Sequence, residues 1–422
     1  MFHDLSRLVR ADAAPPTSPA YDVRALRWLE HPGYLRARRL LEATDARTLD
    51  DQVALTAVPA PPFHESERGR VMAGMMRECG LEVSEPDAVG NVVGWFPESG
   101  AWTPGAAAPA PLVVSAHLDT VFPPGTRIEV EREGDLLRAP GIADDARGLT
   151  ALLALTRAAR EAALDFDSPL LVVATVGEEG AGDLRGVRHL FSPRGALRAG
   201  CAAFLSLDGA GIRRIVNVGL GSLRYRATVR GPGGHSWVDY GTPNPIHALA
   251  RALDNLTRVP LPTVPSTTLS IGRWGGGTSV NAIPTEAWVE FEVRSEAEVE
   301  LSRMDLEIRS ILDRVSGSDP GGRGELVLTL DRLGRRPAGG TPAHHPVVES
   351  ALAATRALGV SPELAISSTD ANLPMSLGVP AITLGAGGDA GQAHTPGEWY
   401  RNVKGPDGIA RALLTLLLLD GR

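Results

Sequence analysis

The sequence predicts an α/β protein with two parts: a large domain built on a doubly wound, mixed sheet, and a smaller α+β domain inserted into it. From about residue 50 to residue 207, short apolar runs alternate with helical patterns, which is typical of a doubly wound sheet. From residue 222 to residue 330, the order becomes strand, helix, strand, strand, helix, strand, which is the ferredoxin-like arrangement. Helix and strand patterns then return, which indicates that the chain re-enters the large domain.

The large domain is predicted from apolar runs and from apolar residues at helical spacing. Leu170–Val176 is a continuous apolar run, as expected of a strand that is buried on both faces. The helical pattern Glu65–Cys79 is followed by Gly80, a residue type that commonly ends helices. The other expected strands are Gly90–Phe96, Leu112–Ala116, Ala202–Leu207 and Ala381–Leu384, and the other expected helices are Leu149–Ala163, Pro346–Leu358 and Asp407–Leu418.

The inserted domain begins where the pattern changes near Gly221. Ser222–Arg230 alternates between apolar and polar residues, as a half-exposed strand does. The Gly- and Pro-rich stretch Gly334–Pro342 is expected to be the linker back to the large domain. The other expected strands are Thr267–Trp274, Glu286–Arg294 and Glu325–Leu330, and the expected helices are Pro245–Arg258 and Glu296–Ser316.

These patterns define the expected domain boundaries. The large domain covers residues 46–220 and 335–422, and the inserted domain covers residues 221–334. Residues 1–45 are expected to form an N-terminal arm, because prolines recur between residues 11 and 21. A chain of 422 residues also exceeds the usual size of one hydrophobic core, which favours two domains.

Composition narrows the possible partners and location. The formal net charge of −8 argues against a nucleic-acid or acidic-membrane partner. No apolar run is long enough to span a membrane, and the first ten residues lack the apolar core of a signal peptide. The only cysteines, Cys79 and Cys201, lie in apolar patterns and are expected to be buried rather than paired. We therefore expect a cytoplasmic protein.

Five short polar segments carry the chemistry, and most of them follow a predicted strand. Carboxyl ends of strands are where ligands collect in doubly wound sheets. A hydrolytic dinuclear site needs imidazoles, terminal carboxylates and a bridging group that holds the ions about 3.5–4 Å apart. The five segments offer this set of groups: Ser115–Asp119, Ala143–Asp145, Gly177–Gly180, Leu207–Gly209 and Gln392–Thr395.

The residue types suggest a role for each ligand. His117 and His394 would each supply an imidazole to one ion. Glu179 and Asp208 would each supply a terminal carboxylate. Asp144 would bridge both ions. No thiolate takes part, which favours zinc, cobalt or manganese over a soft metal.

Two further carboxylates complete the predicted centre. Asp119 lies two residues after His117, close enough to hydrogen-bond the ring and hold its tautomer. Glu178 adjoins a ligand without being one, so it is the natural general base for a metal-bound water. It would accept the proton of the water that attacks a carbonyl and then pass that proton to the leaving nitrogen.

Each segment alone also has an ordinary explanation. Acidic residues at Asp144–Asp145 would be favourable at the start of any helix. Asp208–Gly209 would suit a simple turn, and Glu178–Glu179 an exposed loop. These ordinary explanations are improbable for all five segments at once. The five segments lie in one predicted domain, and most of them directly follow a predicted strand.

At these residues the chain resembles the dinuclear-zinc exopeptidase and aminoacylase family, which includes glutamate carboxypeptidase, peptidase T, aminoacylase and succinyl-diaminopimelate desuccinylase. The segments SAHLDTV, GIADDARG, VGEEGAGD and SLDG carry the resemblance, which extends from Leu49 to the C-terminus. It implies a phosphorylase/hydrolase-like catalytic domain that binds two Zn²⁺, with Co²⁺ or Mn²⁺ possible. It also implies that the five ligands and the base are those given above, and that the Asp144–Asp145 peptide is cis.

The resemblance assigns further residues to substrate. His235, in the segment GPGGHS, would stabilise the oxyanion, often from the partner subunit, so the inserted domain would be a lid and dimerisation domain. Asn281 would bind substrate, and Arg294 would bind a substrate carboxylate, although an exposed strand end explains Arg294 equally well. Asp370 lies in a loop that most resembles the peptidase T-like branch. It would pair with a free amino group, or be a surface charge.

Three functions remain open from the sequence. The first is metal-dependent hydrolysis of amide bonds in small peptides by a di- or tripeptidase-like exopeptidase. The second is a deacylase or amidohydrolase of N-acyl amino acids. Asp208 favours the first, because aspartate is commoner here among the family's aminopeptidases and dipeptidases. A non-catalytic binding module is disfavoured, since no ligand is missing. We expect a homodimer through the lids, because an open sheet edge invites pairing.

Overall fold

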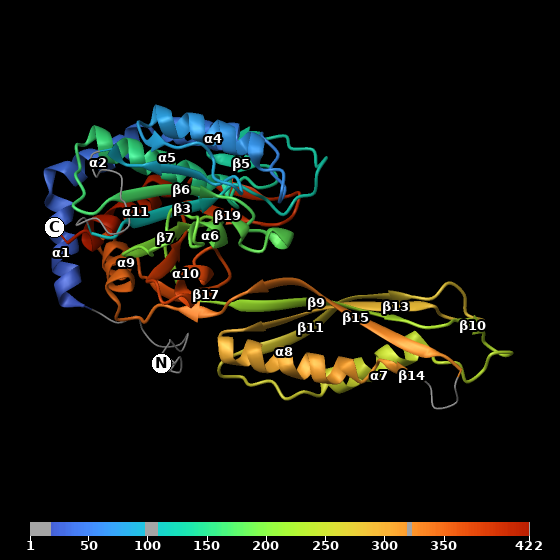
Figure 1. Ribbon diagram of the computed structural model, residues 1–422. Helices are drawn as coiled ribbons and strands as arrows, with labels where there is room; N and C mark the ends of the chain where they lie inside the picture. Colours follow the sequence, from blue (N-terminus) through green and yellow to red (C-terminus); the bar gives the residue numbers. More distant parts are fainter. Residues whose placement is uncertain (1–17, 98–108, 319–322, 422) are drawn as a thin grey trace. The chain divides into compact units, whose positions relative to one another are not determined.

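The computed structural model describes residues 18–97, 109–318 and 323–421 (Figure 1). The chain forms two compact units, one comprising Met1–Gly219 and Gly340–Arg422 and the other Leu220–Gly339. Among the described residues, every helix is too short or too polar to cross a membrane.

A nine-stranded mixed sheet forms the centre of the first unit, as predicted. Its middle strands β6, β3, β7 and β18 are parallel to one another, whereas β2 and β8 flank them antiparallel. Every residue of β3 and β6 is buried, which explains why apolar residues predominate in both strands. The order is β1 (Glu82–Val83), β2 (Val92–Trp95), β6 (Leu170–Thr175), β3 (Leu112–His117), β7 (Ala203–Leu207), β18 (Ala381–Leu384), β8 (Arg214–Gly219) and β16 (Gly339–Gly340), and β17 (Glu363–Ser367) also pairs with β8.

Helices cover both faces of this sheet. Alternate strand residues point to opposite sides, so Val114 belongs to one hydrophobic cluster and its neighbour Val113 to another. The cluster with Val114 includes residues of α1 (Pro19–Glu30), α2 (Pro32–Ala43), α3 (Asp45–Thr56), α4 (Ser66–Glu78), α5 (Ala146–Glu161), α9 (Pro346–Ala357) and α11 (Gly405–Leu419). The cluster with Val113 includes residues of α6 (Arg185–Leu190) and α10 (Asn372–Ser376).

The N-terminal arm predicted for residues 1–45 is not an arm where it is described. Residues 1–17 lie outside the described part, but α1 and α2 pack into the main core. Tyr34 is fully buried, and its hydroxyl donates to the carbonyl oxygen of Ala410 in α11 at 3.1 Å. Prolines occur both in linkers and at the starts of helices, so their presence does not by itself indicate an arm. Pro19 and Pro32 instead occupy the first turn of a helix, where a missing N–H has no consequence.

The first unit also contains a small four-stranded sheet, which the sequence did not predict. Its strands are short and antiparallel. Strand pairing in this sheet joins residues 389–401 to residues 131–138, so two parts of the chain that are distant in the sequence are held in register. The order is β19 (Asp389–Gly391), β20 (Trp399–Arg401), β5 (Leu136–Arg138) and β4 (Glu131–Glu133).

The second unit has the predicted β-α-β-β-α-β order. Its antiparallel sheet runs β11, β13, β9, β15, β14, and helices α7 and α8 cover one face. The expected linker begins inside a strand, because β15 continues to Arg336. The elements are β9 (Gly221–Arg230), α7 (Pro245–Thr257), β11 (Thr267–Gly276), β13 (Glu286–Ser295), α8 (Glu298–Asp313), β14 (Gly317–Ser318) and β15 (Glu325–Arg336), with β10 (Gly234–His235) and β12 (Ala282–Ile283) as a separate pair.

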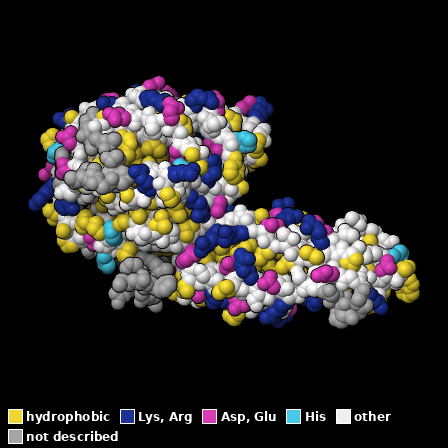
Figure 2. All heavy atoms as spheres, in the orientation of Figure 1, with side chains coloured by type: hydrophobic (Ala, Val, Ile, Leu, Met, Phe, Trp, Pro, Cys, Tyr) yellow, Lys and Arg dark blue, Asp and Glu magenta, His cyan; other side chains and the backbone are white. Residues whose placement is uncertain are grey.

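The face of this sheet opposite the helices carries charges of both signs. Arg226 forms an ion pair with Glu290 at 2.7 Å, and its guanidinium lies 4.1 Å from the centre of the Trp288 ring. On the face of this unit that Figure 2 shows, basic and acidic side chains lie interspersed. The end of the unit that carries β10 exposes Trp237 and Tyr240.

Candidate metal centre

Three neighbouring parallel strands bring three of the five predicted ligands to one edge of the large sheet. His117 is the last residue of β3, Glu178 and Glu179 follow β6, and Asp208 follows β7 directly. Because β6, β3 and β7 are adjacent and parallel, their carboxyl ends meet at the same edge. The strand-end placement inferred from the sequence is therefore the placement in the fold.

Asp144 lies between the two histidines. Its Oδ1 is 2.9 Å from Nε2 of His117, and its Oδ2 is 3.0 Å from Nε2 of His394. Glu179 Oε1 is also 3.0 Å from Nε2 of His394. One carboxylate thus presents one oxygen to each imidazole, which is the arrangement required of a group that bridges two ions.

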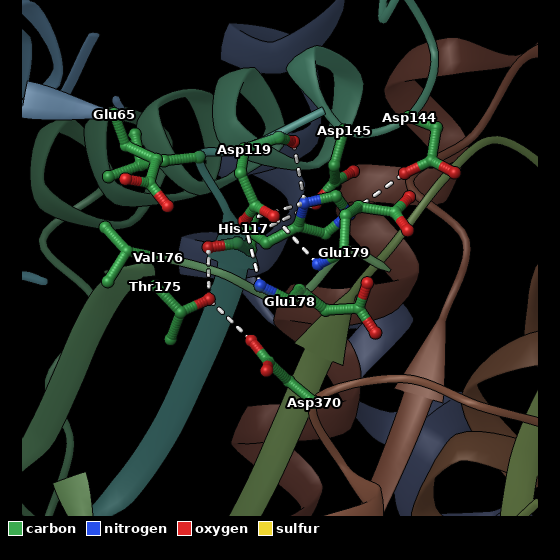
Figure 3. Close-up of polar contacts among 12 residues, drawn as sticks. Glu65, His117, Asp119, Asp144, Asp145, Thr175, Val176, Glu178, Glu179 and Asp370 are labelled. Atoms are coloured by element: carbon green, nitrogen blue, oxygen red, sulfur yellow. Dashed lines mark hydrogen bonds and ion pairs between the residues drawn. The ribbon is translucent and has the colours of Figure 1, made fainter. Parts of the chain in front are cut away.

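The donor set fits divalent cations. Single ligand atoms of His117, Asp144 and Glu179 all lie within 4.8 Å of one another. Figure 3 shows the carboxylates of Asp144, Glu178 and Glu179 directed to the same side of the site. Among the described residues of this cluster, the donors are imidazole nitrogens and carboxylate oxygens, a combination that suits zinc, cobalt or manganese.

The electrostatics of the cluster also indicate a place for cations. Hydrogen bonds to Asp144 and Glu179 raise the pKa of His394 to about 10. Burial lowers the pKa of His117, but hydrogen bonds to acidic neighbours outweigh burial and raise it well above its ordinary value. Burial and the nearby charge of Asp144 likewise raise the pKa of Asp208. Protons are held here by concentrated negative charge, and metal ions would replace them.

Asp119 holds the backbone of the Glu178–Glu179 segment. Its Oδ1 accepts a hydrogen bond from Glu178 N at 2.9 Å, and its Oδ2 accepts one from Glu179 N at 2.7 Å. The same carboxylate lies beside the ring of His117, with Oδ1 3.7 Å from Nδ1. The carbonyl oxygen of Asp119 lies closer to the same ring nitrogen, at 3.0 Å. Asp119 therefore faces the His117 ring with both its side chain and its backbone.

Asp145 forms hydrogen bonds to three segments of the site, a role that was not predicted from the sequence. It caps α5 by accepting from Gly148 N at 3.0 Å. It also accepts from His117 N and from Gly209 N, both at 3.1 Å. An aspartate directly before a helical pattern is a signal for a cap, but not for the other two contacts. The peptide bond between Asp144 and Asp145 is cis, as the resemblance implied.

A buried arginine lies behind these carboxylates. Arg68 on α4 is fully buried, and its guanidinium donates to the carbonyl oxygens of Leu118 and Val58 at 2.9 and 2.8 Å. Burial lowers the pKa of Arg68 to about 10, while Asp119 and Asp145 oppose that shift. Its positive charge therefore offsets part of the negative charge of the centre from the side of the core.

Asp370 belongs to the same region of the first unit. Its Oδ2 accepts a hydrogen bond from the Thr175 hydroxyl at 2.5 Å, at the end of the strand that leads to Glu178 (Figure 3). Its side chain is 1% exposed, so the alternative of a surface charge does not hold.

The predicted substrate residues of the second unit fall into two places. His235 and Asn281 come together, because β10 pairs with β12 and Ser236 N donates to the carbonyl oxygen of Asn281 at 3.1 Å. Both side chains are exposed. Arg294 lies on β13 of the five-stranded sheet of the second unit, on the face opposite the helices. Its Nε is 2.5 Å from Oε1 of Glu292.

Comparison with known proteins identifies one family. The sequence profile of Peptidase family M20/M25/M40 matches residues 113–418, more than half of the chain. The chain is 26% identical over 368 residues to the uncharacterised protein YqjE of Bacillus subtilis, across 84% of this chain and 93% of that protein. It is 32% identical over 229 residues to succinyl-diaminopimelate desuccinylase of Stenotrophomonas maltophilia, across 50% of this chain and 60% of that enzyme.

The fold has a close counterpart among solved structures. Aminopeptidase PepT of Bacillus cereus matches with a TM-score of 0.71 at 22% sequence identity, covering 89% of this chain and 99% of that chain. This likeness confirms the predicted fold class. Because the family profile covers residues 113–418, more than half of the chain, the chain belongs to Peptidase family M20/M25/M40 and is a metal-dependent hydrolase of amide bonds.

Proposed function

We propose that this protein is an exopeptidase that hydrolyses unblocked di- and tripeptides at a dinuclear centre, with Glu178 as the general base. The observation that carries the proposal is the position of Asp144 between His117 and His394, with the carboxylate of Glu179 also at His394. Zn²⁺ is the metal that we propose first, and Co²⁺ and Mn²⁺ suit the same donors.

The site residues have separate proposed roles as metal ligands, general base and backbone support. His117, Asp144 and Asp208 would hold one ion, and His394, Asp144 and Glu179 the other. Bound ions would polarise the scissile carbonyl and acidify the attacking water. Glu178 would take the proton of that water and pass it to the leaving nitrogen. Asp119 supports this step, because it fixes the backbone of Glu178 with a hydrogen bond of 2.9 Å.

The substrate is proposed from charged groups that would meet the two ends of a peptide. Asp370 would pair with a free amino group, and Arg294 and Asn281 would bind a carboxylate. His235 would stabilise the oxyanion, a role whose loss costs about 10²–10³ in rate in other enzymes. The fold likeness to an aminopeptidase agrees with this reading. The sequence similarity to a desuccinylase supports the alternative, a deacylase of N-acyl amino acids.

A hydrolysis panel separates the two substrates. The protein would be loaded with Zn²⁺, Co²⁺ or Mn²⁺ and given free dipeptides, the same dipeptides with an N-acetyl group, and N-succinyl amino acids. We expect the free peptides to be hydrolysed fastest. If N-acyl amino acids are the best substrates, the deacylase function replaces the exopeptidase.

We also propose a homodimer through the second unit and a cytoplasmic location. Strand β11 has ten residues and lies at the edge of its sheet, where a second copy could pair with it. Both cysteines are free thiols, as is usual in a reducing compartment. Light scattering that shows a monomer at micromolar concentration would exclude the dimer.

A further inference from the structure

A further buried carboxylate, that of Glu398, touches the centre without occupying a ligand position. Its side chain is fully buried. Oε1 accepts hydrogen bonds from Ala143 N at 2.8 Å and Asp144 N at 2.9 Å, and Oε2 accepts one from Gly141 N at 3.1 Å. Gly141 has a φ of +76°, a conformation that favours glycine. The three N–H groups converge on one anion, as they do in backbone anion-binding nests.

Glu398 also joins the two segments that carry the bridging aspartate and the second histidine. It follows His394 by four residues and directly precedes β20, which pairs with β5 in register. Its own carbonyl oxygen accepts from Ala139 N at 3.1 Å. Main chain and side chain of Glu398 therefore both attach the His394 segment to the loop that presents Asp144.

We propose that Glu398 is a positioning residue that fixes Asp144 and His394 relative to each other and so sets the affinity of the centre for its metal ions. The inference rests on the proposed ligand set and not on the choice of substrate. Because Asp144 would be shared by both ions, loosening its loop weakens both binding steps. Changes to residues that hold metal ligands in place typically reduce metal affinity or activity about 10–100-fold.

Glu398→Gln is the sharpest test, because it preserves size. The amide oxygen of glutamine can still accept from Ala143 N and Asp144 N, but its NH₂ group would face the N–H of Gly141, and two donors cannot bond. Glu398→Ala removes all three contacts and leaves a cavity. Glutamine should therefore weaken metal binding, and alanine should weaken it further.

The chain offers a matched control in Asp420. Its carboxylate is also buried and also accepts from two backbone N–H groups, those of Asp167 at 2.6 Å and Ser168 at 2.7 Å. These residues precede β6, whereas the metal centre lies beyond the other end of that strand. Asp420→Asn removes the same kind of bond at a place that cannot orient a ligand, so it reports the purely structural effect.

The experiment is calorimetric titration of metal-free protein with Co²⁺, together with the absorption spectrum of the bound ion and the thermal midpoint of each metal-free variant. We expect Glu398→Gln to bind both ions about 10–100-fold more weakly with an altered spectrum. Asp420→Asn should bind like the unchanged protein even if its midpoint falls. Wild-type affinity in a folded Glu398→Gln protein would overturn the proposal, as would an equal loss of affinity in both variants. No peptide is needed, so the result is independent of the substrate.

Discussion

At the scale of single residues, the centre separates groups that would hold ions from the group that would move a proton. Glu178→Gln keeps the size of the side chain and the backbone bond from Glu178 N to Asp119. We expect both metals to be retained and turnover to fall by about 10²–10⁴, the usual contribution of a general base. Metal analysis and steady-state kinetics on the same preparation check this. His117→Ala, the comparison variant, should lose metal as well as turnover.

A Glu178→Gln enzyme with near-normal turnover would show that the base lies elsewhere. Loss of metal in that variant would instead move Glu178 into the ligand set.

The proposed role of Asp370 in binding substrate can be tested separately from its hydrogen bond with Thr175. Asp370→Asn should reduce the preference for free peptides over N-acetyl peptides, because it removes the proposed partner of the amino group. Thr175→Val removes the hydroxyl that donates to Asp370 while leaving the carboxylate charge in place. The ratio of kcat/KM for a free dipeptide and its N-acetyl form is the measurement. If both variants change the ratio equally, Asp370 acts through Thr175 and not on substrate.

At the scale of elements, α1 and α2 are part of the core of the first unit. Tyr34→Phe removes the hydrogen bond to the Ala410 carbonyl, whose oxygen then stays buried without this donor. We expect a loss of about 0.5–1.5 kcal/mol in the free energy of unfolding, the usual net contribution of one hydrogen bond, with unchanged kcat. Urea denaturation measures it. Leu26→Ala on the exposed side of α1 is the control and should change stability by less than about 0.5 kcal/mol.

Denaturation of Tyr34→Phe that matches the unchanged protein would mean that α2 does not dock on α11 as described.

Strand β6 and helix α1 show why some elements can be predicted from the sequence and others cannot. Leu170–Val176 was recognisable because burial on both faces requires an unbroken apolar run. In α1 only Ala25 and Trp28 are buried, so its apolar pattern is too weak to distinguish a helix from a linker that contains proline.

At the scale of the whole molecule, metal occupancy and stability should be coupled. Ions that bind only the folded state stabilise it by about 2.7 kcal/mol at a concentration one hundred times Kd. Removing metal should therefore lower the thermal midpoint, and restoring Zn²⁺ should recover it. Calorimetry of the metal-free and reloaded protein measures both. Identical midpoints would argue against a site formed only on folding.

The metal-free protein should also lose stability as pH rises. The folded-state pKa of His394 is about 10, above its ordinary value of 6.5, because Asp144 and Glu179 hold the proton. The stabilisation from this proton is complete below pH 6.5 and is lost as pH rises toward 10. In metal-loaded protein the ion takes the place of the proton, so the loss should be absent. Midpoints measured from pH 6 to pH 10 with and without Zn²⁺ test this; parallel curves would contradict it.

The sequence by itself determined the fold class and the order of most elements, because burial and local backbone preference leave periodic patterns in a chain. It also placed the candidate site residues His117, Glu178 and Asp208 at strand ends, since each lies one or two residues past an apolar run. Only the tertiary structure decided that Asp144 lies between histidines 27 and 250 residues away, or that Glu398 holds the Asp144 loop. Such convergence depends on how distant segments pack, and no local pattern records it.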